Sequence, residues 1–173
     1  QIDLDALALA TGLAGNIAIP VVKQFTAIVK QNDEDAARYV HWGATSQDIL
    51  DTACILQCRA AMTHVEALIH QCYRTALTQA EQYRSQVMIG RTWLQQGLPI
   101  TLGHKFARWA SAFYRDLARI EAMKARVFTA QLGGAVGSLA SLQAQGTAVV
   151  HAYSVQLQLS VPSCTWHGER DRI

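Results

Sequence analysis

Apolar residues recur at helical spacing over the central part of the chain. Residues 46–87 contain neither glycine nor proline, and one face of this stretch would carry Ile49, Ala53, Leu56 and Ala60. Spacings of three and four place side chains on one side of an α-helix. A second apolar face runs beside the first: Ile55, Met62, Ile69 and Tyr73. We therefore expect a helix of about 40 residues and about 60 Å that packs on more than one side.

A second long helix is expected over residues 100–128. Its apolar residues again follow spacings of three and four: Phe106, Trp109, Phe113, Leu117, Ile120 and Met123. Residues 88–98, which contain Gly90 and Gly97, predict a break between the two long helices. Pro99 would then lie in the first turn of the second helix, where a missing N–H is tolerated.

Two shorter helical regions flank the long ones. Residues 4–29 are rich in aliphatic side chains and predict a helix that is disturbed near Gly15 and Pro20. Residues 139–159 predict another helix, interrupted at Gly146. Long helices joined by short loops indicate an all-α fold, a long-helix bundle. We therefore look for function in the loops.

Composition narrows the class of protein. Half of the residues are apolar and 16% are charged, which excludes a disordered segment. So few charges on long helices predict that some helix faces meet other subunits. The net charge is +2 without a basic stripe, so we expect no nucleic-acid partner. No apolar run reaches the roughly 20 residues that span a bilayer, so we expect no membrane partner.

The cysteines predict a reducing compartment, and hence a cytoplasmic protein. Cys54, Cys58 and Cys72 lie in one helical stretch at spacings that do not indicate disulfides, and Cys164 lies near the end of the chain. We expect them to be buried, reduced thiols. Cys54 and Cys58 would share a helix face, but no further ligand pair accompanies them, so we expect no metal site.

The loop before the longest helix carries candidate chemistry. Thr45 and Ser46 are N-cap residue types, and Asp48 lies in the first helical turn. Unpaired amides at a helix start, together with two hydroxyls, can hold a small carboxylate. The alternative is an ordinary capping box. Spacing alone favours the capping box, because Asp48 would repel an anion unless it points away.

Residues 41–52 read His-Trp-Gly-Ala-Thr-Ser-Gln-Asp-Ile-Leu-Asp-Thr. This stretch resembles the first signature of the fumarase/aspartase superfamily, and it is most similar to the versions in adenylosuccinate lyases and carboxymuconate cycloisomerases. The resemblance implies that Thr45 and Ser46 bind a substrate carboxylate. It also implies that His41 lies in the site, and we take His41 as the candidate catalytic residue.

Residues 90–99 read Gly-Arg-Thr-Trp-Leu-Gln-Gln-Gly-Leu-Pro. They resemble the second signature of the superfamily, except that Trp93 stands where most of the lyases carry a catalytic histidine. The departure disfavours an adenylosuccinate lyase and matches the form of the bacterial cycloisomerases. The resemblance implies that Arg91, Thr92 and Gln96 bind substrate, although an arginine in such a loop often pairs within the protein.

Two later segments complete the resemblance. Residues 131–138 form a glycine-rich stretch without the Lys-Ser/Thr of a phosphate-binding loop. The superfamily carries a similar segment near its active site, which makes Gln131 a candidate ligand contact. Residues 166–172 resemble the stretch before the next long helix of the superfamily. Arg170 there is a candidate contact for an anionic substrate, with a structural salt bridge as the alternative.

The resemblance implies a fragment of a larger enzyme. Residues 1–173 would cover the end of an N-terminal region and much of the central helical bundle of a homotetramer, without the C-terminal part. The third signature would lie beyond Ile173, so the fragment alone should be inactive. The implied reaction converts a small polycarboxylate, 3-carboxy-cis,cis-muconate, into a lactone during breakdown of aromatic compounds, without a cofactor. An adenylosuccinate lyase-like elimination and a non-catalytic helical scaffold are the alternatives.

Overall fold

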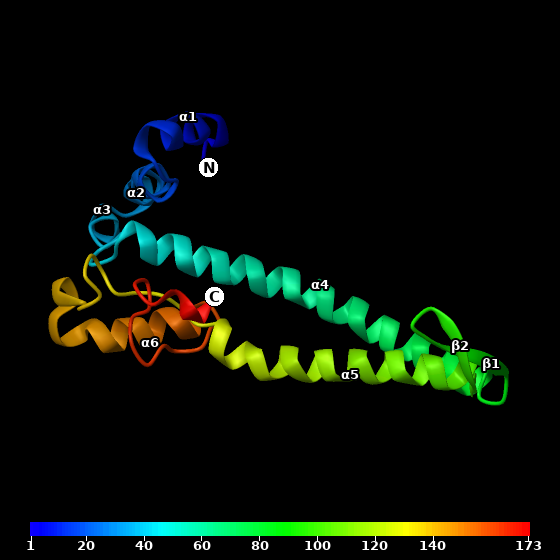
Figure 1. Ribbon diagram of the computed structural model, residues 1–173. Coiled ribbons are helices and arrows are strands. Elements are labelled where there is room, and N and C mark those ends of the chain that lie inside the picture. The colour runs from blue at the N-terminus through cyan, green and yellow to red at the C-terminus, as the bar shows by residue number, and fades with distance from the viewer. The chain divides into compact units, whose positions relative to one another are not determined.

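The computed structural model describes the whole chain, residues 1–173, and divides it into two compact units. One unit comprises Gln1–Gln57 and Arg126–Ile173, and the other comprises Cys58–Ala125. Helices make up most of both units, as Figure 1 shows. No helix is at once long enough and apolar enough to cross a membrane.

The first unit begins with α1 (Leu4–Ala14), α2 (Ala18–Asn32) and the single turn α3 (Glu34–Ala37). The side chain of Asp3 caps α1, and Gly15 ends it with a φ of 76°. Glycine adopts this left-handed conformation without steric cost, which is why it so often follows a helix. The expected helix over residues 4–29 is therefore two helices, and the disturbance lies at Gly15 as predicted.

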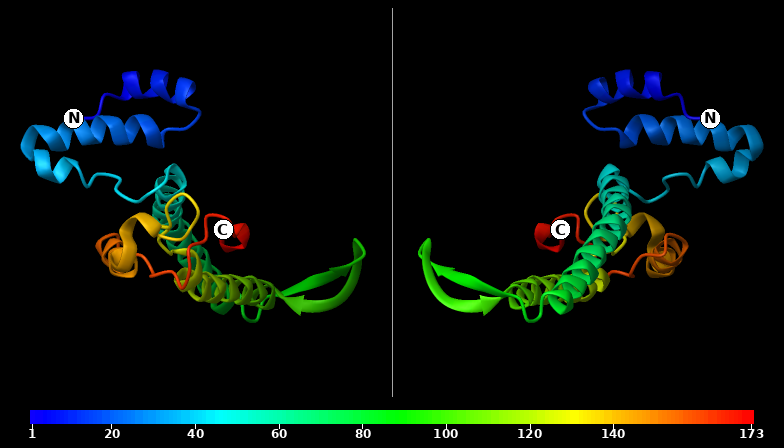
Figure 2. Two further views of the ribbon diagram at one scale, coloured as in Figure 1. Left: turned by 90° about the vertical axis from the view of Figure 1, so that its left-hand side faces the viewer. Right: turned by 90° about the vertical axis from the view of Figure 1, so that its right-hand side faces the viewer.

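Helix α2 starts at a local cap. The Asn16 carboxamide oxygen accepts a hydrogen bond from the backbone N–H of Ala18 at 3.1 Å. Pro20 lies in the first turn of α2, where its missing N–H removes no helical hydrogen bond, so it does not disturb the helix. The Gln24 side chain bonds the backbone of Asp3 through both its oxygen and its nitrogen, at 2.9 and 3.1 Å. These bonds hold α1 alongside α2, as both views of Figure 2 show.

The first unit continues with the N-terminal part of α4 (Ser46–Gln82) and with the segment that follows α5 (Leu102–Val127). That segment contains η1 (Ala140–Gln145), α6 (Gly146–Gln156) and the short η2 (Arg170–Arg172). The predicted helix over residues 139–159 thus becomes a 3-10 helix and an α-helix that meet at Gly146. The predicted glycine-rich loop before it is confirmed.

The core of this unit forms where the chain returns to α4. Its buried members are Ile55, Ala130, Leu159 and Trp166, each at most 7% exposed. The Trp166 indole N–H donates to the Ala130 carbonyl at 2.9 Å, so this large side chain is buried without an unpaired polar atom. The core therefore fastens the segments on either side of α6 to the first turns of α4.

In the second unit, α4 and α5 run side by side in opposite directions (Figure 1). Aromatic pairs join them, with ring centroids 6.1 Å apart for Tyr73–Tyr114 and 6.2 Å apart for Tyr83–Phe106. The ammonium of Lys124 lies 3.0 Å from the Glu66 carboxylate of α4. The two predicted long helices are confirmed, and they end within a few residues of the expected bounds.

The segment between the long helices is a β-hairpin, an element that the sequence did not predict in this mostly helical chain. Strands β1 (Val87–Thr92) and β2 (Gln95–Thr101) pair antiparallel and project beyond the helices of their unit (Figure 2). Pro99 pairs with Ile89 in this ladder, so it does not lie in the first turn of α5 as expected. The ladder is irregular between Ile89 and Arg91.

The hairpin turn explains why the sequence did not predict it. Trp93 and Leu94 occupy the two turn positions with φ values of 51° and 61°. A two-residue hairpin turn of this kind normally carries asparagine and glycine, because both central residues need a positive φ. Trp93 and Leu94 are also 91% and 99% exposed in the chain. Two strained apolar residues therefore form the tip of the hairpin.

Gly103 fixes the close approach between the start of α5 and the end of α4. A Cβ atom at this position would lie 2.5 Å from the Ala80 carbonyl oxygen and 2.7 Å from the Arg84 Cα. The Gly103 N–H donates to the Tyr83 carbonyl at 2.9 Å. Because the obstructing atoms belong to the backbone, a side chain at position 103 must move one helix away from the other.

We expect Gly103→Ala to lower the free energy of unfolding by about 2 kcal/mol or more, because overpacking against backbone forces the helices apart. Urea denaturation at a fixed protein concentration measures the effect. Gly12→Ala is the matched control, since Gly12 lies in α1 and a Cβ added to it would meet nothing within 4 Å. Alanine there should be neutral or stabilise by up to about 1 kcal/mol. Equal effects of the two substitutions would contradict the packing argument.

Candidate functional site

The start of α4 presents unpaired hydrogen-bond donors. The backbone N–H groups of Ser46 and Gln47 and the hydroxyls of Thr45 and Ser46 make no hydrogen bond within the chain. These four groups lie at the positive end of a helix of 37 residues. Aligned peptide dipoles and free amides at such an end attract anions. The arrangement can hold a carboxylate, as predicted from Thr45 and Ser46.

Asp48 does not oppose an anion at this position, because its carboxylate is turned inward. The side chain is 1% exposed and accepts four hydrogen bonds from N–H groups. Oδ2 accepts from Thr45 N and Gly134 N, both at 2.9 Å. Oδ1 accepts from Gln131 Nε2 at 2.9 Å and from Gly133 N at 3.0 Å. The bond to Thr45 is half of a capping box, so both interpretations of this turn hold: Asp48 caps the helix, and other donors remain free.

The glycines of the glycine-rich loop, residues 131–138, allow it to wrap around this carboxylate. Gly134 has a φ of 73°, and a Cβ on it would lie 2.7 Å from the Gly43 carbonyl oxygen. A larger residue at position 134 would therefore clash with the loop before α4. A Cβ on Gly133 would instead lie 2.8 Å from the Thr165 side chain, so neither glycine has room for a side chain while its amide points at Asp48.

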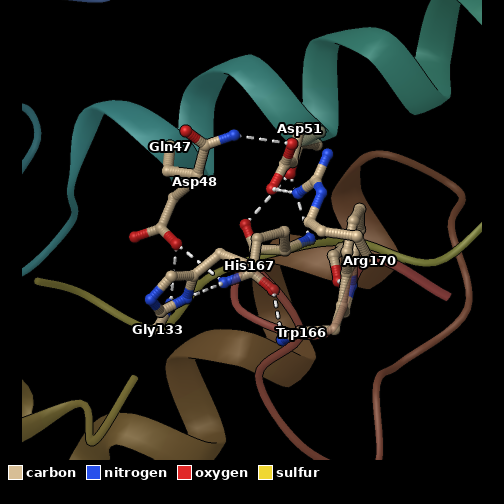
Figure 3. A network of polar contacts seen from close by, with 10 residues as sticks. Gln47, Asp48, Asp51, Gly133, Trp166, His167 and Arg170 are labelled. Atoms are coloured by element: carbon tan, nitrogen blue, oxygen red, sulfur yellow. Dashed lines mark hydrogen bonds and ion pairs between the residues drawn. The ribbon is translucent and has the colours of Figure 1, made fainter. Parts of the chain in front are cut away.

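Gln131, predicted as a ligand contact, links the glycine-rich loop to α4 and to the segment around Trp166. The residue is 0% exposed, and its backbone N–H and C=O both bond the Thr52 hydroxyl, at 3.0 and 2.9 Å. Its side-chain oxygen accepts from Trp166 N at 2.7 Å, and its nitrogen lies 3.1 Å from His167 Nδ1. Every polar group of Gln131 is therefore bonded within the chain. Figure 3 labels its neighbours Asp48, Trp166 and His167.

Arg170 forms a salt bridge, so the structural alternative for this residue is the one observed. Its Nη1 lies 2.7 Å from Asp51 Oδ2, and its guanidinium lies 5.8 Å from the centre of the Trp166 ring (Figure 3). The hydrogen bond to Asp51 raises the pKa of Arg170 above its usual value. Asp51 is 3% exposed and also accepts from Gln47 Nε2 at 2.9 Å. A substrate would have to compete with this pairing to bind Arg170.

Tyr153 of α6 borders the same network. Burial raises the pKa of the Tyr153 hydroxyl, the Thr52 hydroxyl lowers it, and the charge of Asp48 raises it further. The phenol therefore stays protonated through the neutral range, and it adds no second negative charge beside Asp48.

His41 lies in a strained turn before α4. Its backbone has a φ of 63°, which is uncommon for a residue with a side chain. The turn is held by the indole of Trp42, which donates to the Ser141 carbonyl at 3.3 Å, and by Gly43, which packs against Leu142. The Nδ1 atom of His41 is buried and has no hydrogen-bond partner. Strain and an unpaired polar atom together are typical of functional positions.

The remaining predicted residues lie in the second unit, on the hairpin. Arg91 and Gln96 face each other across β1 and β2, and Thr92 is the last residue of β1. All three side chains are exposed and make no hydrogen bond within the chain. The structure thus groups His41, Thr45 and Ser46 in one unit and Arg91, Thr92 and Gln96 in the other.

The cysteines differ from the prediction in one respect. Cys54, Cys58, Cys72 and Cys164 carry no disulfide, but all four are exposed in the chain instead of buried. The first three lie on α4, and most residues of this helix are exposed in this chain. No group of three or more histidine, cysteine, aspartate or glutamate residues lies so that it could hold a metal ion.

Sequence reasoning missed the role of the chain end at this site. His167 bonds to Gln131, and Asp48 and Asp51 are the two acids on which the network converges. The only available signal was a pair of spacings. Asp48 and Asp51 lie three apart at a helix start, and His167 and Arg170 lie three apart much later in the sequence. Contacts separated by 83 and 119 positions leave no periodic pattern in a sequence.

We expect Asp48→Asn to lower the free energy of unfolding by about 3 kcal/mol, because an amide group turns one accepting oxygen into a donor facing buried N–H groups. Urea denaturation measures the loss. Asp5→Asn in the first turn of α1 is the control, since Asp5 is exposed. It should change stability by less than about 1 kcal/mol. A loss at position 48 no larger than that of the control would contradict the buried network.

Comparisons with known proteins identify the family. A family model described as "Lyase" matches residues 9–173. The chain is 76% identical over 173 residues to 3-carboxy-cis,cis-muconate cycloisomerase of Acinetobacter baylyi, covering 100% of this chain and 38% of that protein. It is 42% identical over 171 residues to the enzyme of the same name from Pseudomonas putida, covering 99% of this chain and 40% of the relative.

A solved structure agrees. The crystal structure of beta-carboxy-cis,cis-muconate cycloisomerase from Acinetobacter calcoaceticus superposes with a TM-score of 0.94 at 77% identity, covering 99% of this chain and 40% of that one. The chain spans about two fifths of the length of these relatives. Because the family model covers nearly all of its residues, the chain belongs to the lyase family of the fumarase/aspartase superfamily.

Proposed function

We propose that the complete protein is a cycloisomerase that converts 3-carboxy-cis,cis-muconate into a carboxylated muconolactone. One carboxylate oxygen of the substrate forms a bond to an alkene carbon, and the neighbouring carbon takes up a proton. Relatives that are 76% and 42% identical to this chain carry the name of this activity. The reaction needs no cofactor, and we propose that it takes place in the cytoplasm.

The observation that carries the proposal is the set of unpaired donors at the start of α4. Addition across the double bond builds negative charge on the carbon next to a carboxylate. Fixed N–H and O–H donors around that carboxylate stabilise the charge without having to reorganise. The hydroxyls of Thr45 and Ser46 and the free N–H groups of Ser46 and Gln47 are donors of this kind.

The network behind these donors supports the same interpretation. The Asp48 carboxylate points inward and its charge is stabilised by four N–H donors, so it does not oppose a bound anion. His41 lies four residues before Thr45, and its buried Nδ1 lacks a partner, which supports a role in the site. We propose that His41 binds the substrate or takes part in proton transfer.

The hairpin supplies the second group of predicted contacts. We propose that Arg91, Thr92 and Gln96 bind substrate in a site completed by neighbouring copies of the chain. Their side chains are exposed and unpaired here, so they are free to bind a polycarboxylate.

The experiment is an assay of the full-length protein with two substrates. Ultraviolet absorbance should fall when 3-carboxy-cis,cis-muconate is added, because lactone formation removes a conjugated double bond. Adenylosuccinate should not be cleaved. Cleavage of adenylosuccinate would replace the proposal with an elimination enzyme, and turnover of neither substrate would favour a helical scaffold.

Variants in the same assay test the role of the α4 donors. Thr45→Val and Ser46→Ala should each reduce kcat/KM by about tenfold to a hundredfold, the usual cost of a hydrogen bond to a charged group. Thr63→Val is the control, because the Thr63 hydroxyl is exposed on α4 and bonds only the Arg59 carbonyl. Unchanged kinetics in both site variants would remove Thr45 and Ser46 from the mechanism.

We also propose that the complete protein is a homotetramer. The hairpin tip places Trp93 and Leu94 in solvent at 91% and 99% exposure, and such apolar surface normally meets another chain. Light scattering coupled to size-exclusion chromatography should give a tetramer mass at micromolar concentration. A monomer mass would contradict this assembly and the shared sites that depend on it.

A further inference from the structure

His167 holds its imidazole ring next to the Asp48 network, with one ring nitrogen bonded and the other free. Nδ1 lies 3.1 Å from Gln131 Nε2. Figure 3 shows the His167 ring beside Asp48 and Gly133. Nε2 makes no hydrogen bond within the chain and is not enclosed, although the residue as a whole is half-buried. The ring therefore offers one open nitrogen, and the state of that nitrogen depends on Gln131.

The orientation of the Gln131 amide is fixed from both ends. Its oxygen is 2.7 Å from the backbone N–H of Trp166, which can only donate. Its nitrogen is 2.9 Å from the Asp48 carboxylate, which accepts. A flipped amide would set a donor against a donor and an oxygen against a carboxylate. The group that faces His167 is thus the amide nitrogen.

This orientation determines the tautomer of His167. The amide nitrogen has two protons and cannot accept, so it donates one proton to Asp48 and the other to His167 Nδ1. Nδ1 must then be the unprotonated nitrogen of the ring. The proton of the neutral imidazole lies on Nε2, the nitrogen without a partner in the chain, and Nε2 is therefore a hydrogen-bond donor.

The free donor lies close to the start of α4. Asp48 accepts from Gln131 and also from the backbone N–H of Thr45, so two shared partners connect the His167 ring with the first turn. A substrate with several carboxylates needs donors for more than one of them. The α4 donors can hold one carboxylate, which leaves another carboxylate of the same molecule in need of a donor such as His167 Nε2.

We propose that His167 is a substrate-binding residue that donates a hydrogen bond from Nε2 of its neutral ring to a carboxylate of the polycarboxylate held at the start of α4. This inference rests on the proposed function. Asp48 and Gln131 are positioning residues that act through His167. Asp48 orients the Gln131 amide, and the amide determines the His167 tautomer, although Asp48 makes no hydrogen bond to the His167 ring. His167 binds the substrate and does not transfer the proton.

Two substitutions in the full-length protein separate the ring nitrogens. His167→Asn keeps an acceptor near the position of Nδ1 and removes the Nε2 donor. His167→Gln places an amide near the position of Nε2 and removes the Nδ1 acceptor. We expect His167→Asn to raise KM by about tenfold to a hundredfold and to change kcat little. His167→Gln should keep more substrate affinity and lose more thermal stability.

His151→Asn is the control, because His151 is exposed on α6 of the same unit and makes no hydrogen bond through its side chain. It should leave KM and kcat unchanged. An unchanged KM in His167→Asn would overturn the inference while wild-type turnover left the proposed function intact. A large fall in kcat at unchanged KM would also overturn it, because proton transfer would then be the role. Wild-type protein without turnover of carboxymuconate would overturn both.

The tautomer can be measured without activity. Magic-angle-spinning spectra of protein labelled with ¹⁵N-histidine distinguish the two neutral tautomers, and the signal absent from His167→Asn is that of His167. We expect a protonated Nε2 and an unprotonated Nδ1 at neutral pH. A protonated Nδ1 would overturn the inference whatever the kinetics.

Discussion

The buried carboxylate of Asp48 organises the first unit of this chain. A charge with 1% exposure is stable only when hydrogen bonds replace the water that it has lost. Here two of those bonds come from backbone amides of the glycine-rich loop, one comes from the turn before α4, and one comes from Gln131. One acid thus joins two loops, because the turn before α4 and the glycine-rich loop both donate to its carboxylate.

Asp48 also caps α4 without using all the hydrogen-bond donors at the start of the helix. A helix start that binds its own carboxylate would ordinarily be closed to a ligand. Asp48 reaches back from the third helical position and takes the Thr45 amide, while the hydroxyls of Thr45 and Ser46 and the next two amides stay free. The helix is therefore capped and remains able to bind an anion. Asp51 repeats the inward arrangement one turn later through Gln47 and Arg170.

The sequence predicted the elements that depend on local spacing. Both long helices, the break at Gly15 and the glycine-rich loop follow from local spacing and from the conformations that glycine allows. The hairpin did not, because Trp93 and Leu94 occupy turn positions that usually carry asparagine and glycine. The site residues before and within α4 came from a resemblance to a family. Gln131 was predicted as a ligand contact from that resemblance, whereas its burial depends on partners far away in the chain, which local spacing cannot predict.

That distance has a consequence for how the chain folds during synthesis. The partners of Asp48 and Asp51 lie 83 to 119 positions later, after both long helices and the hairpin. The start of α4 therefore leaves the ribosome well before the segments that donate hydrogen bonds to Asp48 and Asp51. Local helix formation comes early, whereas closing so long a loop is slow and entropically unfavourable. The turn before α4 is thus made long before the contacts that order it can form.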